Sequence, residues 1–382
     1  MKKLFRSFGY PEVVWLPKSE HSFLTFICVS FIVVMFVTPY PQYAMWAGFL
    51  FAAYAAIAND SIQTIGTFIA SNQDKKWWVL WIFIGGIFFF TMFYSWITFG
   101  GDVSHGRLTS KGFDIAPTEF HFLQVAAPIF LLILTRLRMP VSTTFILLTS
   151  FAATPDAVGG VLAKSMSGYI LSFLMGLIFF LIVAKASKKY FTGEAKFGWT
   201  IAQWITSGTL WSVWLMQDAA NIAVYLPRSL NTVEFIGFIT IVVIGLGCLL
   251  YYKGGRIQKI VTEKSVVTDV RFATLIDLIY CVILFYFKLH SKVPMSTTWV
   301  FIGLLAGREL GMAIMKTGDK SIWNAIKLGF KDMSYALIGL VISIAIAIGV
   351  NDQLTVSSMV ETIPKEFASG IVDFFSKIGF SK

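Results

Sequence analysis

Long apolar runs almost free of charge limit most strongly what this chain can fold into. They cover residues 24–37, 77–96, 122–134, 170–183, 235–251, 275–287 and 335–350. A helix needs about 20 mostly apolar residues to cross a bilayer, or about 17 at the short end. Several runs reach that length when the more polar residues at their ends are included. Each run is apolar all round, unlike an amphipathic helix that lies on a soluble core. The sequence therefore predicts an all-α integral membrane protein.

Composition agrees with this prediction. The chain is 56% hydrophobic and only 14% charged, whereas a soluble domain carries about 25% charged residues. The net charge of +10 comes from Lys and Arg between the apolar runs, as at 185–196 and 253–271. Membrane topology explains such loops. Because no Arg-rich stripe is interleaved with exposed aromatic residues, we expect no nucleic-acid partner. The first apolar run has no small-residue cleavage site after it, which indicates a retained helix.

Two polar motifs each occur twice, in the same order. Pro-Val-Ser-Thr-Thr at 140–144 returns as Pro-Met-Ser-Thr-Thr at 294–298, an offset of 154 residues. Asn-Asp-x-x-Gln at 59–63 returns as Gln-Asp-x-x-Asn at 217–221, an offset of 158 residues. Repeats of this size are typical of secondary transporters, whose sites lie at the repeat interface near the bilayer midplane. We expect a first transmembrane repeat over 1–190, a second over 191–352, and an amphipathic tail over 353–382 along the membrane interface.

The acidic motif puts a carboxylate and two amides on neighbouring positions of a helix. The groups are Asn59, Asp60 and Gln63 in one half, and Gln217, Asp218 and Asn221 in the other. An ionised Asp at membrane depth is costly and usually faces a cavity, an ion or a partner. Oxygen ligands suit a hard cation such as Na⁺, or a carboxylate that takes up a proton. The alternative is a polar cluster that only holds helices together, and the duplication favours a site.

The Ser-Thr motif is suited to the start of a helix. Proline fits the first turn, and Ser or Thr can cap it. A helix that starts inside the membrane offers free N–H groups and a positive dipole end, which together bind anions. The runs that follow, 145–153 and 299–306, are too short to span and end at Thr154-Pro155-Asp156 and Gly307-Arg308. They predict re-entrant half-helices that line a cavity, or else ordinary helices that start at the interface.

Other polar residues carry weaker signals. Asp277 lies inside an apolar run and is a proton-relay candidate, or else lies near the boundary and pairs with Arg271 or Lys288. Arg136, Arg138 and Lys292 flank the Ser-Thr motifs, either to attract anions or as topology charges. No Walker motif, Ser-His-Asp set or Gly-rich dinucleotide loop occurs, so we expect neither an ATP-driven pump nor an enzyme.

At these four stretches the chain resembles the inorganic phosphate transporter (PiT) family. That family carries Gly-Ala-Asn-Asp-Val-Ala-Asn-Ala-Phe-Gly-Thr and Pro-Val-Ser-Thr-Thr-His motifs once per half. Here the first reads Ile-Ala-Asn-Asp-Ser-Ile-Gln-Thr-Ile-Gly-Thr at 57–67. The chain departs from the pattern at Phe145 and Trp299, where the family has His. It departs again at Gln63 and Gln217, where the family has Asn, and at Ile57, where it has Gly.

The resemblance implies symport of phosphate, or of sulfate in some members, with Na⁺ or H⁺ as the coupling ion and no other cofactor. It implies two inverted repeats with re-entrant half-helices, and we expect about 10–12 transmembrane segments. By position, the cation would be held by Asp60, Asp218, Gln63, Asn221 and Thr67, with Na⁺ at the two acids. The anion would be held by Ser142, Thr143, Thr144, Ser296, Thr297, Thr298, Asn59 and Gln217.

The expected setting is a multi-pass protein of the cell membrane in contact with lipid, and a homodimer is left open. A sulfate transporter of the same fold is one alternative. A passive anion channel, or a membrane scaffold without transport, is the alternative from a different functional class.

Overall fold

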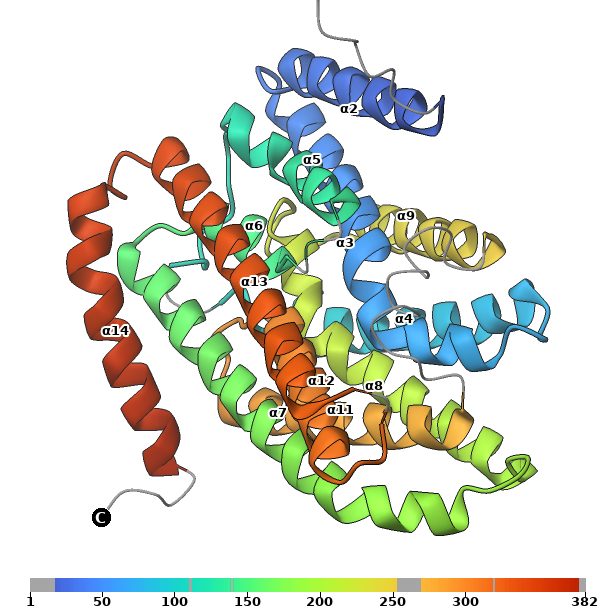
Figure 1. Ribbon diagram of the computed structural model, residues 1–382. Helices are drawn as coiled ribbons and strands as arrows, with labels where there is room; N and C mark the ends of the chain where they lie inside the picture. Colours follow the sequence, from blue (N-terminus) through green and yellow to red (C-terminus); the bar gives the residue numbers. More distant parts are fainter. Residues whose placement is uncertain are drawn as a thin grey trace, which may run out of the picture.

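Helices account for the architecture of the described chain. The computed structural model describes residues 18–252 and 269–377, apart from positions 110, 111, 138, 140 and 319. Two residues named above, Arg138 and Pro140, therefore lie outside the described residues. The helices are α2 (Lys18–Val37), α3 (Pro41–Ser71), α4 (Trp77–Thr98), α5 (Phe122–Arg136), α6 (Thr143–Ile146), the 3-10 helix η1 (Leu148–Phe151), α7 (Pro155–Tyr190), α8 (Phe197–Ala223), α9 (Thr232–Tyr251), α11 (Val270–His290), α12 (Thr297–Ile314), α13 (Ile322–Val350) and α14 (Val356–Lys377) (Figure 1).

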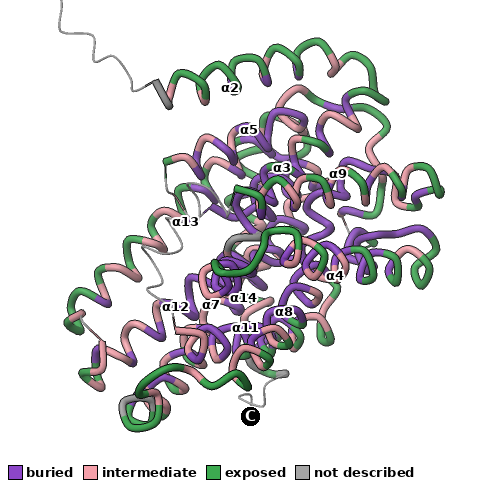
Figure 2. The backbone as a smooth tube through the Cα atoms, turned by 90° about the vertical axis from the view of Figure 1, so that its right-hand side faces the viewer, coloured by how far each residue is buried: buried purple, intermediate pink, exposed green. Residues whose placement is uncertain are grey.

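Six of these helices are long and apolar enough to cross a membrane. They are α2, α4, α7, α9, α11 and α13. The motif helices α3 and α8 are also long, at 31 and 27 residues, and they carry buried acids along otherwise apolar sequence. The outer helix α2 is mostly exposed, which suits contact with lipid (Figure 2). This arrangement confirms the expected all-α membrane fold.

The helices of the two halves pack in matching pairs. Helix α3 contacts α5 as α8 contacts α11, α6 contacts α13 as α12 contacts α7, and α4 contacts α9. In Figure 1, α3 and α7 run in the opposite direction to their counterparts α8 and α13, as inverted repeats do. The helix that follows each Ser-Thr motif, α6 or α12, therefore packs on the last long helix of the other half. The proposed boundaries near 190 and 352 stay a prediction.

Glycines bring α12 unusually close to α7. Gly303, Gly307 and Gly311 follow one another at four-residue spacing along α12 and face α7. A Cβ atom at Gly307 would lie 2.1 Å from the carbonyl oxygen of Phe173, and one at Gly303 would lie 2.6 Å from that of Tyr169. Small residues at this spacing let two helix backbones approach closely. These glycines are therefore packing positions.

The predicted break at Gly307-Arg308 is wrong. Helix α12 continues through both residues to Ile314. The reason is that Gly307 fits against α7, while Arg308 stacks over Phe180 and pairs with Glu309 at 3.1 Å. In the first half, α6 and η1 do end before a new helix starts at Pro155. The two halves thus differ in the length of the helix that follows the Ser-Thr motif.

The C-terminal tail forms α14 and packs against α7 (Figure 1). A Cβ atom at Gly159 would lie 2.7 Å from the Cβ of Glu366, and one at Gly370 would lie 2.6 Å from the Cβ of Ala163. Phe374 stacks on Phe287 of α11, with ring centroids 5.7 Å apart. The tail is therefore held along the bundle by tight packing.

Candidate functional site

The acid of the first half is held by its own Ser-Thr motif. Asp60 lies in the middle of α3 and accepts hydrogen bonds from Asn59 Nδ2 at 2.7 Å and from the Thr143 hydroxyl. Asn59 Nδ2 also reaches the carbonyl oxygen of Val141 at 3.1 Å, and its Oδ1 accepts from Thr135 at 3.3 Å. The two motifs that the sequence separates by about 80 positions are therefore in direct contact.

The second half repeats this contact. Asp218 on α8 accepts a hydrogen bond from the Thr297 hydroxyl at the first position of α12, and from Asn221 Nδ2 at 2.8 Å. The Trp214 indole N–H donates to the Thr297 hydroxyl at 3.2 Å. Asp60 with Thr143 and Asp218 with Thr297 are thus equivalent acid–hydroxyl pairs. The structure brings both copies of both motifs into one buried region.

Thr144 links the two halves. Its hydroxyl lies 3.4 Å from Asp218 Oδ1, 3.1 Å from the Met295 carbonyl oxygen, and accepts from Asn221 Nδ2 at 3.1 Å. Asp60 bonds to Thr143 and Asp218 lies 3.4 Å from the next residue, Thr144, so the two acids lie close together and repel each other when both are ionised. A cation between two such buried acids would offset that repulsion. A cavity of about 20 Å³ beside Asp218 is lined almost entirely by apolar side chains, so it is not itself a polar binding site.

The two serines of the motifs act as helix caps. The Ser142 hydroxyl accepts from the backbone N–H of Phe145, and the Ser296 hydroxyl from that of Trp299, both at 3.2 Å. Helix α12 has 18 residues, so its start carries a helix dipole. Helix α6 has only four residues, so the first half contributes mainly its hydroxyl groups. Between these two helix starts, the positive helix end is therefore a feature of the second half alone.

Three amide oxygens of the predicted site have no hydrogen-bond partner within the described part of the chain. They are Gln63 Oε1, Gln217 Oε1 and Asn221 Oδ1, and all three are buried. Gln217 uses its Nε2 on the Leu284 carbonyl oxygen at 2.8 Å. A buried polar atom without a partner is costly and calls for a ligand or water. Amide and carboxylate oxygens together form a donor set that fits Na⁺.

Thr67 belongs to a different polar centre. Its hydroxyl donates to Asp277 Oδ1 at 2.8 Å, and Ser207 of α8 donates to Asp277 Oδ2 at 2.5 Å. Thr67 lies two helical turns from Asp60 along α3. Asp277 is 1% exposed and sits on α11 between the two motif helices. It is thus an intramembrane acid near the twin site.

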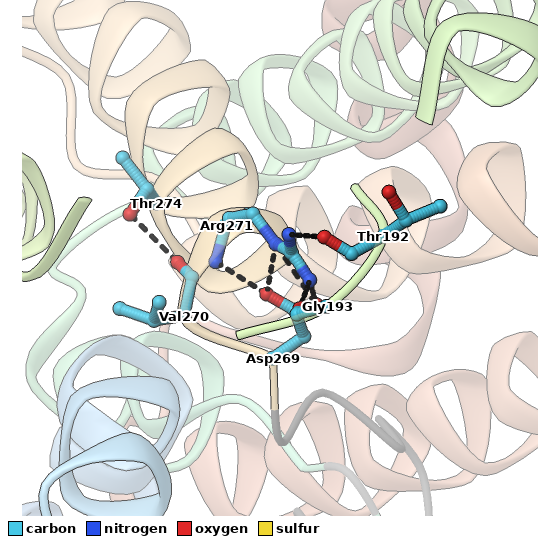
Figure 3. A network of polar contacts seen from close by, with 6 residues as sticks. All are labelled: Thr192, Gly193, Asp269, Val270, Arg271 and Thr274. Carbon is cyan, nitrogen blue, oxygen red and sulfur yellow. Dashed lines mark hydrogen bonds and ion pairs between the residues drawn. The ribbon is translucent and has the colours of Figure 1, made fainter. Parts of the chain in front are cut away.

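The basic residues considered as partners of Asp277 are engaged elsewhere. Arg271 pairs with Asp269 at 2.6 Å and donates to the Gly193 carbonyl oxygen at 3.1 Å, which joins α11 to the linker between the halves (Figure 3). Lys288 Nζ donates to the His105 carbonyl oxygen at 3.3 Å. The interpretation that Asp277 pairs with Arg271 or Lys288 at the boundary is therefore wrong.

Two of the residues that depart from the family pattern, Phe145 and Trp299, contact each other. The rings of Phe145 and Trp299 lie 5.1 Å apart between centroids, and both are buried. They follow the two Ser-Thr motifs directly, so the two motif ends meet through an aromatic pair. Thr298 is buried beside Trp299. An apolar contact thus stands where the resemblance expects two imidazoles.

The sequence analysis did not identify two buried basic residues near the site. Arg107, in the loop after α4, and Lys164, on α7, both donate to the Val293 carbonyl oxygen just before the second Ser-Thr motif. A lone Arg in a loop has no pattern that places it at a distant site. By contrast, Arg136, which flanks the first motif, pairs with Glu20 of α2 at 2.6 Å.

Comparisons with known proteins add one finding. No family model and no curated protein sequence matches the chain. A solved structure described as the sodium-dependent phosphate transporter is similar at a TM-score of 0.48 and 14% identity, covering 92% of this chain and 100% of that chain. A likeness at this level carries no argument about function.

Proposed function

We propose that the protein is a secondary active transporter that moves a small inorganic oxyanion, with phosphate as the first candidate. The convergence of the two acid–hydroxyl pairs, Asp60 with Thr143 and Asp218 with Thr297, supports this most directly. Duplicated acids buried at membrane depth are costly unless they bind something. Their position between two oppositely directed sets of helices suits a site that opens alternately to each side.

The carboxylate and amide oxygens would bind the cation, and the hydroxyl groups would bind the anion. Asp60 and Asp218, with the unpartnered oxygens of Gln63, Gln217 and Asn221, would hold Na⁺ or exchange protons. The hydroxyls of the Ser-Thr motifs and the start of α12 would hold the anion, and the Asn59 amide, already bonded to Asp60 and Val141, would fix the position of that site. Because the Thr143 and Thr297 hydroxyls already contact the acids, cation and anion would lie side by side. Each would then screen the other's charge, which is a physical basis for coupled transport.

Uptake into proteoliposomes tests the proposal. Labelled phosphate should accumulate above its outside concentration when Na⁺ is higher outside, and the accumulation should disappear without the gradient. The same experiment with a pH gradient distinguishes H⁺ coupling, and labelled sulfate tests the second substrate. Equilibration without accumulation would instead support the passive channel. No movement of either anion would support a membrane scaffold. The proposal also includes the cell membrane as the location and a homodimer. The uptake assay tests neither of these.

Ser142→Ala should abolish uptake although the protein stays folded. The change removes a cap, which costs about 1 kcal/mol of stability, and removes a hydroxyl from the proposed anion site. Ser321→Ala is the matched control, because Ser321 caps α13 by accepting from Asn324 N at 3.3 Å on an exposed surface. Ser321→Ala should lose a similar amount of stability and keep its uptake. Equal uptake by both variants would remove Ser142 from the site.

A further inference from the structure

A row of basic side chains leads from the surface towards Asp218. Lys292 is exposed and Lys288 is half-buried. Lys164 and Arg107 lie deeper, with 9% and 0% of their surface exposed. Lys288 Nζ donates to the His105 carbonyl oxygen at 3.3 Å, two residues before Arg107. Arg107 and Lys164 both donate to the Val293 carbonyl oxygen, and Arg107 Nε reaches the Met216 carbonyl oxygen, two residues before Asp218. The row therefore joins the surface to the acid of the second half.

The two innermost cations share their acceptors. Arg107 Nη1 donates to the carbonyl oxygens of Ser291 at 2.6 Å and Val293 at 3.2 Å. Lys164 Nζ donates to the same two oxygens, at 3.4 Å from that of Ser291. Cations that bond to the same oxygen lie only a few ångströms apart, so their repulsion in a medium of low dielectric constant is large. A bound anion would relieve that repulsion.

The surroundings hold these cations in place. Asp102, the nearby acid of the same loop, accepts from Ser104 N at 2.6 Å, Ser104 Oγ at 2.8 Å and Gly106 N at 2.8 Å. Arg107 Nε donates to the Met216 carbonyl oxygen at 3.3 Å, two residues before Asp218. These hydrogen bonds hold the loop so that Arg107 lies next to the acidic motif of α8. The carboxylate of Asp102 already accepts three hydrogen bonds.

We propose that Arg107 and Lys164 form a second oxyanion subsite, where a small inorganic oxyanion binds before it reaches Ser296 and Thr297. Lys288 and Lys292 would attract the anion from water. A guanidinium and an ammonium side by side give the charged donors that a tetrahedral oxyanion accepts best. The identity of the ligand rests on the proposed function. The ordinary alternative is that both cations only bind carbonyl oxygens after the end of α11, where positive charge is favourable.

Lys164→Gln separates the two interpretations. Glutamine keeps an N–H donor for the Val293 carbonyl oxygen and loses the charge. Binding of labelled inorganic phosphate to the full chain in lipid nanodiscs should weaken at least about tenfold, because a hydrogen bond from a charged donor is lost. Lys185→Gln, an exposed change on the same helix, should bind phosphate as the wild type does. Melting temperatures confirm that each variant is folded.

A second variant separates the subsite from the main site. Thr297→Val removes a main-site hydroxyl and should weaken phosphate binding at the main site, whereas the share of binding that Lys164→Gln weakens should persist. Unchanged affinity in Lys164→Gln, or no phosphate binding by the wild type, would overturn the subsite. Binding that depends on Lys164, without accumulation in proteoliposomes, would leave the subsite standing and refute transport. The two proposals can therefore fail independently.

Discussion

Asp60→Asn should abolish phosphate accumulation in proteoliposomes and leave the protein folded. Asparagine keeps an oxygen for the 2.7 Å bond from Asn59, and its amide can donate to the Thr143 hydroxyl, which rotates to accept. The shape of the site is therefore preserved and only the charge is lost. A buried cation without its counter-charge costs about 3 kcal/mol or more, so uptake should fall at least about 100-fold.

The measurement is the initial rate of labelled phosphate uptake under an imposed Na⁺ gradient. Asp352→Asn removes the same charge from an exposed position and should transport like the wild type. Phosphate exchange without a gradient adds a second readout. Because asparagine resembles a protonated carboxyl, exchange should survive in Asp60→Asn if the acid carries H⁺, and be lost if it binds Na⁺. Wild-type uptake by Asp60→Asn would place the cation elsewhere.

Gly307→Ala should prevent the chain from reaching a stable folded state. The added Cβ would lie 2.1 Å from the Phe173 carbonyl oxygen and 2.8 Å from the Leu177 backbone nitrogen. Both are backbone atoms of α7, so neither can rotate away as a side chain would. Overpacking usually costs about 1–3 kcal/mol, and a collision between two helix backbones belongs at or above the top of that range. The contact also joins the two halves.

Gly86→Ala is the matched control for this change. Gly86 lies inside α4, and nothing in the described part of the chain lies within 4 Å of a Cβ placed there. Alanine should therefore be tolerated, with a gain of up to about 1 kcal/mol in helix stability. Thermal melting and size-exclusion chromatography in detergent provide the comparison. A melting temperature for Gly307→Ala within about 2 °C of the wild type would contradict the tight-packing interpretation.

The polar motifs were predictable because each is local. Asn59 and Asp60 are chain neighbours inside an apolar run, and Ser142 through Thr144 form a continuous helix start. Their duplication at nearly constant offset also indicated that both copies serve one site. In the structure the acids contact the threonines of their own halves, and the binding roles of these groups stay a prediction. Thr67 is the exception among them, because its side chain turns to Asp277.

The lengths of the two helices that follow the Ser-Thr motifs were harder to predict. Gly307 is a helix breaker by its own propensity, but it lies in a continuous helix because α7 leaves no room for a side chain there. Packing thus overrides local preference in the second half. In the first half, Pro155 coincides with the start of a new helix, so the local signal and the fold agree.

The sequence alone determined that this is an all-α membrane protein with a duplicated acid and hydroxyl motif, because apolar length and local spacing are properties of the chain itself. The tertiary structure decided which groups meet. The Asp277–Ser207 bond, the Thr144 link to Asp218, and the bond from Arg107 to the Ser291 carbonyl oxygen join residues 70, 74 and 184 positions apart. No local pattern encodes such contacts, because they depend on how oppositely directed helices pack.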